Sequence, residues 1–255
     1  MNPFPIHDIA KLIDHALLHP TQTDEELHAG CQVALAYNVA SVCIKPFAVS
    51  IAARLLVGSS VRVGTVIGFP HGSNALSLKL AETVQACRDG AVEIDMVVNI
   101  GKVLSNDWSY ISDEIRAVFY TCQEYGAILK VIFETDFLSD DALKIRLCQI
   151  CTEVGVEFVK TSTGFGFVKG TDGKYDYQGA TEHDLRLMLT HVGPNVQVKA
   201  SGGIRTLDEL LKLKALGVSR IGTSSTVAII NEAYRRSGMV VPSMAVPPIT
   251  ELNGY

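Results

Sequence analysis

Two lysines stand inside stretches that the sequence predicts to be buried strands. Lys160 follows Phe158 and Val159 in FVKTSTGFG, and Lys199 lies in VQVKASG, residues 196–202. A buried ammonium is costly unless it is paired or loses its proton. Taken alone, either lysine is explained more simply by a buried ion pair than by catalysis.

The two lysines together favour an amine that does chemistry. If their strands are neighbours and both side chains point inward, each ammonium destabilises the other and the apolar wall adds desolvation. Both effects lower the pKa of a lysine. A lysine with a pKa of ~7–8 can attack a carbonyl and form a Schiff base, whose iminium withdraws electrons from the adjacent carbon–carbon bond. This is class I aldolase chemistry, and it predicts Lys160 and Lys199 as catalytic residues.

No cofactor or metal is expected for this chemistry. The seven histidines form no H-E-x-x-H or comparable ligand motif. Cys148 and Cys151 form a C-x-x-C, but their segment is typical of an amphipathic helix and no second ligand pair follows at zinc spacing.

Further polar residues fall in the other predicted strands. In a barrel of parallel strands, the carboxyl ends meet at the face where active sites are built. We therefore expect several of these side chains to converge on the two lysines. They are Asp14, Cys43, Lys45, Asp95, Lys130 and Glu134.

Short apolar runs alternate with amphipathic stretches along the chain. The runs are rich in β-branched residues and nearly continuous, as strands buried on both faces are. Capping residues followed by acidic residues mark helix starts at 23–26, 139–141, 181–182 and 206–209. The predicted strands span residues 12–18, 40–45, 62–69, 93–99, 128–135, 157–163, 196–202 and 219–225.

Eight strands, each followed by a helix, predict a single-domain α/β fold, a (β/α)8 barrel. A doubly wound sheet is the alternative, but the strand count and the absence of a linker favour the barrel. We expect the barrel to occupy residues 1–237, with residues 1–11 as a short N-terminal extension over its bottom. Residues 238–255 contain prolines and lack a helical period, which predicts a mobile C-terminal tail.

Composition narrows the class of protein. Hydrophobic residues make up 47% of the chain, and the net charge of −5 argues against a nucleic-acid partner. The chain shows no secretory signal and no apolar run of about 18 residues, so no membrane partner is expected. The six cysteines are scattered through apolar segments, as reduced thiols of a cytoplasmic protein are.

Small residues follow the last two predicted strands and favour phosphate binding. Ser201-Gly202-Gly203-Ile204-Arg205 precedes one predicted helix, and Gly222-Thr223-Ser224-Ser225-Thr226 precedes another. Small residues let backbone N–H groups approach an anion, and helix N-termini favour negative charge. Barrels often bind phosphate at these two loops.

The motifs, in this order, resemble those of the deoxyribose-phosphate aldolases. The resemblance runs from about residue 11 to residue 228. It implies a (β/α)8 barrel that reversibly cleaves 2-deoxy-D-ribose 5-phosphate to D-glyceraldehyde 3-phosphate and acetaldehyde. The matching motifs are LIDHALL, TVIGFPHG, EIDMVVNIG, KVIFET, FVKTSTGF, VKASGGIR and RIGTSS.

The resemblance also implies residue roles. Lys160 would form the Schiff base, Lys199 would perturb that amine and join a proton relay, and Asp95 would transfer protons with an ordered water. Tyr255, the last residue, would help proton transfer from a mobile tail. The implied phosphate site is Gly164, Gly202, Gly203, Gly222, Ser224 and Ser225, and we expect further substrate contacts from Asp14, Cys43, Lys130, Thr163 and Arg205.

Two stretches depart from the family pattern. Residues 166–180 form a longer loop on the predicted active-site face, and Lys45 adds a cation near the mouth. Two other functions stay open, a different phosphosugar barrel enzyme such as an isomerase, or a non-catalytic phosphosugar-binding barrel. The partners expected are small phosphorylated sugars and aldehydes. A homo-oligomer, either a dimer or a tetramer, is also expected, although the sequence does not fix the oligomeric state.

Overall fold

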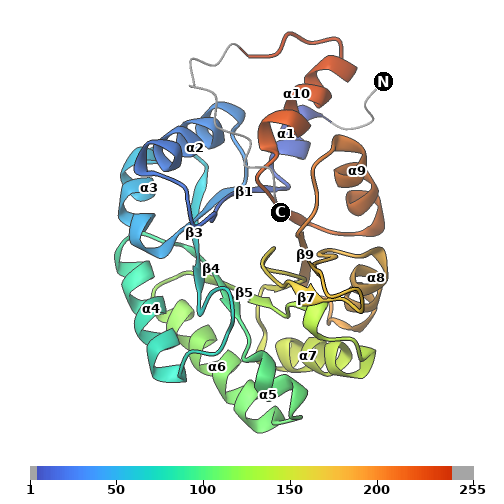
Figure 1. Ribbon diagram of the computed structural model, residues 1–255. Coiled ribbons are helices and arrows are strands. Elements are labelled where there is room, and N and C mark those ends of the chain that lie inside the picture. Colours follow the sequence, from blue (N-terminus) through green and yellow to red (C-terminus); the bar gives the residue numbers. More distant parts are fainter. Residues whose placement is uncertain (1–4, 243–255) are drawn as a thin grey trace.

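The computed structural model describes residues 5–242, and in it eight parallel strands close into a barrel (Figure 1). Each of the eight predicted strands is found inside its predicted range, so the barrel prediction is confirmed. Around the barrel the order is β1-β10-β9-β6-β5-β4-β3-β2. The strands are β1 (Ile13–Leu17), β2 (Ser41–Ile44), β3 (Arg62–Ile67), β4 (Glu93–Val97), β5 (Ile128–Ile132), β6 (Phe158–Lys160), β9 (Gln197–Ser201) and β10 (Arg220–Thr223).

Helices form a ring around the strands (Figure 1). Thr23 and Thr206 start their helices with capping boxes and Thr181 caps a third, as predicted, while Asp140 caps the helix expected near residue 139. The long helices are α2 (Asp24–Tyr37), α3 (Val49–Leu55), α4 (Leu76–Arg88), α6 (Trp108–Glu124), α7 (Asp141–Val154), α8 (Glu182–His191), α9 (Leu207–Leu216) and α10 (Thr226–Arg236). The shorter ones are α1 (Ile6–Ala10), α5 (Ile100–Leu104), η1 (Pro46–Ala48) and η2 (Thr135–Phe137).

Successive strand residues alternate between the helix layer and the barrel interior. Val159 and Ala200, for example, are buried within the apolar core between strands and helices. Their neighbours Lys160 and Lys199 are also buried but carry ionisable amines, which lie within ion-pair distance of carboxylates of other strands. This alternation explains why the strands read as apolar runs interrupted by single charged residues.

The two ends of the chain are described in part. Helix α1 packs against α10, and α10 ends at Arg236, close to the predicted end of the barrel domain. The predicted tail falls mostly on residues 243–255, which lie outside the described residues, so its mobility stays a prediction. Among residues 5–242, no helix has the length and hydropathy needed to cross a membrane.

The predicted long loop contains an element that the sequence analysis missed. Strands β7 (Val168–Lys169) and β8 (Tyr175–Asp176) pair antiparallel, with Val168 opposite Asp176. A turn joins them in which Gly173 has a φ of +83°. The Asp172-Gly173 dipeptide is a common hairpin signal, and it was overlooked because the flanking strands are only two residues long.

Candidate active site

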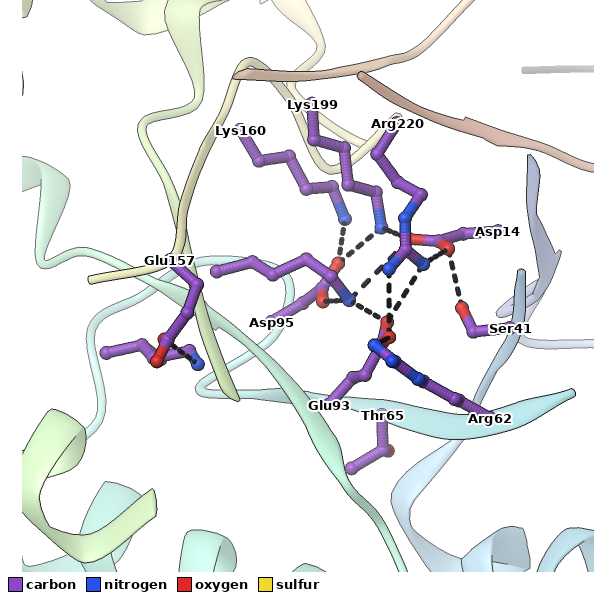
Figure 2. A network of polar contacts seen from close by, with 12 residues as sticks. Asp14, Ser41, Arg62, Thr65, Glu93, Asp95, Glu157, Lys160, Lys199 and Arg220 are labelled. Carbon is purple, nitrogen blue, oxygen red and sulfur yellow. Dashed lines mark hydrogen bonds and ion pairs between the residues drawn. The ribbon is translucent and has the colours of Figure 1, made fainter. Parts of the chain in front are cut away.

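Asp95 is the centre of the polar network inside the barrel (Figure 2). One carboxylate oxygen, Oδ2, accepts from Lys160 Nζ at 2.9 Å and from Lys199 Nζ at 2.7 Å, while Oδ1 accepts from Lys130 Nζ at 2.8 Å. Lys160 and Lys199 are register partners in the neighbouring strands β6 and β9. The predicted convergence of these lysines on one side of the barrel wall is thus present in the structure.

Two more carboxylates, Asp14 and Glu93, complete the cluster. Asp14 pairs with Lys199 and Arg220 and accepts from Ser41 Oγ at 2.6 Å. Glu93 pairs with Lys130 at 2.6 Å and with Arg220 at 2.9 Å. All the ionisable groups of this cluster are buried, namely Asp14, Glu93, Asp95, Lys130, Lys160, Lys199 and Arg220.

Four buried cations therefore face three buried carboxylates, so the cluster is balanced when one cation gives up its proton. Lys160 is the least strongly paired of the four cations, because among residues 5–242 it makes one ion pair, with Asp95. Burial lowers the pKa of Lys160, the Asp95 carboxylate opposes this, and Lys199 lowers it further. The net result is a lowered pKa, which favours a free amine at Lys160.

The pKa prediction was wrong for Lys199. Burial lowers its pKa, but the Asp14 and Asp95 carboxylates outweigh burial and the net shift is upward. Lys199 therefore stays protonated, and its positive charge lowers the pKa of Lys160. The lysine pair is thus one-sided in its net pKa shifts, with the pKa of Lys160 lowered and that of Lys199 raised. The reason is that both Asp14 and Asp95 contact Lys199, whereas only Asp95 contacts Lys160.

Lys130 contacts all three carboxylates of the cluster. Its side chain is 1% exposed, and its ammonium is within 3.6 Å of Asp14, 2.6 Å of Glu93 and 2.8 Å of Asp95. Burial lowers its pKa, but these carboxylates raise it well above the ordinary value. The geometry places Lys130 where it keeps Asp95 ionised, and the substrate contact expected of it stays a prediction.

Cys43 and Thr163 border the cluster on two sides. Burial raises the pKa of Cys43 to about 11, so its thiol is a neutral part of the wall near Lys160 and Asp95. The backbone N–H of Thr163 donates to Glu134 Oε1 at 3.1 Å, and its hydroxyl makes a short hydrogen bond to Glu134 Oε2. Both hydrogen donors of Thr163 are thus committed to Glu134.

Glu134 was among the polar residues expected at the active-site face, but the sequence assigned it no role. It follows β5, is 1% exposed, and adopts a φ of +57°, which is uncommon for a residue with a side chain. Burial raises its pKa to about 7, although the hydrogen bonds from Thr163 act against burial. Its carboxyl group also packs on Gly166, where a Cβ atom would lie 2.8 Å from Glu134 Cδ.

The predicted phosphate loops have backbone geometry suited to an anion. Gly202 and Gly203 have consecutive positive φ angles of +94° and +79°, a backbone conformation that glycine adopts readily and that tight turns able to bind anions use. Helix α10 begins after Ser225, whose side chain makes no capping hydrogen bond. By contrast, Glu209 and Thr206 cap the start of α9. The N-terminus of α10 therefore has no side-chain cap, whereas that of α9 is capped.

The other members of the predicted phosphate site lie at the same face. Ser224 and Arg205 are exposed, and Gly164, with a φ of +88°, directly follows Thr163. Gly222 faces Ser201 on β9, and a Cβ atom there would lie 2.3 Å from Ser201 Oγ. Glycine at this position keeps the wall beside Lys199 open.

Two predicted residues need separate mention. Lys45 does lie after β2, but its ammonium donates to the carbonyl oxygens of His19 and Gln22, each at 3.0 Å. Its charge thus fastens the β1–α2 loop. Tyr255 lies outside the described residues, so its role stays a prediction.

Sequence reasoning missed Glu93 and Arg220, and it gave Glu134 no role. Glu93 could have been found, because it lies two residues before Asp95 on one strand and so points to the same side. Arg220 opens β10, and only the register with Lys199 on β9 shows that it reaches the interior.

Comparisons with known proteins agree with this geometry. A family model described as DeoC/LacD family aldolase matches residues 9–229. A deoxyribose-phosphate aldolase of Rhodopirellula baltica is 48% identical over 94% of this chain and 95% of its own. One of Caldanaerobacter subterraneus subsp. tengcongensis is 44% identical, over 91% and 96%. A solved deoxyribose phosphate aldolase of Aeropyrum pernix superposes with a TM-score of 0.79 at 28% identity, over 92% and 94%.

Proposed function

Because the chain belongs to the DeoC/LacD family of aldolases, we propose that it cleaves 2-deoxy-D-ribose 5-phosphate reversibly to D-glyceraldehyde 3-phosphate and acetaldehyde. The proposed nucleophile is Lys160, acting through a Schiff base. The observation that carries this assignment is the one-sided lysine pair, in which Asp95 joins both ammonium groups but only Lys160 has a lowered pKa.

The reaction starts at Lys160. Its neutral amine attacks the C1 aldehyde of the open-chain sugar, and loss of water from the carbinolamine gives an iminium. The positive charge of Lys199 favours the free amine before attack, since a second cation beside it is disfavoured. Burial in the barrel wall adds to this preference, because Lys160 is only 3% exposed.

Bond cleavage needs a proton acceptor and an electron sink. The C3 hydroxyl proton passes through water toward Asp95 while the C2–C3 electrons move to the iminium, which becomes an enamine. D-Glyceraldehyde 3-phosphate leaves at this step. Lys199, whose pKa is raised, is the proton donor of the relay, and it supplies the proton that C2 of the enamine takes up. Water then hydrolyses the resulting iminium and releases acetaldehyde from Lys160.

The phosphate of the substrate is placed at the Gly202–Gly203 turn and the start of α10. Backbone N–H groups and the Ser224 and Ser225 hydroxyls are the proposed donors. Helix N-termini and small-residue turns favour doubly charged phosphate over a neutral hydroxymethyl group.

A borohydride trap tests this function. Acetaldehyde and borohydride added to the purified protein should give a covalent adduct of one ethyl group, which intact-mass and peptide measurements place on Lys160. Lys160→Ala should give neither adduct nor turnover. An isomerase or a non-catalytic binding barrel would give no adduct, and an adduct on another lysine would overturn the assignment.

Assembly and location extend the proposal. The Aeropyrum pernix relative is described as tetrameric, which supports a homo-oligomer for this chain. The six cysteines are free thiols in the structure, as expected for a reducing cytoplasm. Light scattering coupled to size-exclusion chromatography measures the oligomeric state directly.

A further inference from the structure

The segment between Thr163 and Ala180 is anchored at both ends by one short stretch of chain. At the entry, Glu134 accepts from Thr163 and packs on Gly166. At the exit, Asp136 accepts from the backbone N–H of Gln178 and, at 3.0 Å, from that of Gly179. Two carboxylates only two residues apart therefore fix where the β7–β8 hairpin stands over the barrel.

The exit of this segment lies directly on the proposed phosphate turn. A Cβ atom on Gly179 would lie 2.7 Å from the carbonyl oxygen of Gly202. Ala180 N–H donates to the same oxygen at 3.3 Å, and the Gln178 carbonyl oxygen lies 3.8 Å from a Cβ built on Gly203. The hairpin is thus a neighbour of the phosphate site through main-chain contact and not only through loop length.

Tyr177 precedes these contacts and carries an unused hydroxyl group. Its ring packs edge-on against Phe167, with 5.2 Å between centroids. Its hydroxyl oxygen is buried and has no hydrogen-bond partner among residues 5–242. Burial raises the pKa of Tyr177, and the positive charge of Arg205, in the phosphate turn, acts in the opposite direction. A buried hydroxyl without a partner is destabilising, so such a group calls for an explanation.

We propose that Tyr177 donates a hydrogen bond to a phosphate oxygen of the substrate and is a specificity-determining residue for phosphorylated sugars. Tyr177 is two residues before Gly179, which packs on Gly202 of the phosphate turn, and an unpaired hydroxyl donor next to such a turn can bind an anion. This assignment rests on the proposed function, because it requires a phosphorylated substrate.

The test compares Tyr177→Phe with wild type on two substrates. The change removes one oxygen and keeps the ring that packs on Phe167. For 2-deoxyribose 5-phosphate, kcat/KM should fall about 10-fold or more, mainly through KM, since a hydrogen bond to a charged group is lost. For 2-deoxyribose, kcat/KM should change less than about twofold. Tyr175→Phe is the matched control, because Tyr175 is 66% exposed on the same hairpin, and it should leave both substrates unchanged.

Inorganic phosphate provides a second readout that involves no chemistry. Its inhibition constant against 2-deoxyribose cleavage should rise by a similar factor in Tyr177→Phe. The melting temperature of the ligand-free variant should stay the same or rise, because an unpaired hydroxyl has been removed. Equal losses on both substrates, or an unchanged inhibition constant for phosphate, would overturn the role of Tyr177. Absence of a borohydride adduct in wild type would instead overturn the proposed function.

Discussion

Carboxylates have different roles in two regions of the molecule. One region is the ion cluster at the centre of the barrel, and the other is the segment over its mouth, residues 164–179. In the cluster, Asp95 and its neighbours are buried on regular strands and set the protonation of two lysines. At the mouth, Glu134 and Asp136 accept mostly from backbone N–H groups and hold a chain segment in place. The first arrangement controls reactivity, and the second controls the shape of the substrate site.

The difference also concerns how far each region tolerates change. Every carboxylate of the cluster contacts at least two cations, so removing one leaves several buried charges unbalanced. The hairpin strands β7 and β8 are exposed and pair only with one another. Substitutions in the cluster should therefore affect stability and rate together, whereas substitutions in the exposed hairpin should affect selectivity alone.

Asp95→Asn should have the largest effect. The neutral amide removes one negatively charged partner from both Lys130 and Lys199. Breaking buried ion pairs of this kind costs about 3–5 kcal/mol in the free energy of unfolding. Turnover should fall on the order of 10³-fold, because the proton relay is lost. Urea unfolding and steady-state kinetics measure both. A variant that keeps wild-type stability would refute the view that reactivity and folding share this cluster.

Lys199→Met should sharpen the comparison inside the cluster itself. Lys199 lowers the pKa of Lys160, so its removal should raise that pKa and move the acid limb of the kcat/KM profile to higher pH. At neutral pH the rate should fall about 10²–10³-fold. Lys199→Arg keeps the charge and should keep the limb in place. A shift of the limb to lower pH in Lys199→Met would contradict the one-sided pair.

Glu134→Gln should change how stability at the mouth depends on pH. The pKa of Glu134 is about 7 in the folded chain, above the ordinary value of 4.5, so folding favours its protonated form. Its contribution is complete below about pH 4.5 and is lost as the pH rises through about 7. Between pH 5 and 8, wild type should lose about 1–3 kcal/mol that the glutamine variant retains, as urea unfolding across this range can show. Identical pH slopes would exclude a neutral Glu134.

Lys45→Met should have the smallest effect. The ammonium makes two hydrogen bonds to loop carbonyls, so their loss should cost about 0.5–1.5 kcal/mol in unfolding free energy. The ratio of kcat/KM between phosphorylated and unphosphorylated deoxyribose should stay within about twofold of wild type. A larger change in this ratio would show that Lys45 acts on the substrate, as the sequence analysis expected when it placed an extra cation near the mouth.

The sequence predicts the barrel and the aldolase family well, because local patterns carry both. Each strand is a single apolar run, and Lys160 and Asp95 interrupt such runs visibly. The direction of the Lys199 pKa could not be predicted, since it depends on Asp14 reaching across from β1 through the barrel register. The anchoring by Glu134 likewise depends on a contact with Thr163, 29 positions away in the chain.

The two anchors of the hairpin, Glu134 and Asp136, have a consequence for engineering. A segment fastened at entry and exit by one stretch behaves as a replaceable cassette, because its interior can change length while its ends stay fixed. Replacing residues 167–177 by the matching segment of a homologous enzyme should therefore change which aldehydes the enzyme accepts, without any change to the lysine pair. The junctions to preserve are Gly166 and Gly179, whose close contacts leave no room for a side chain.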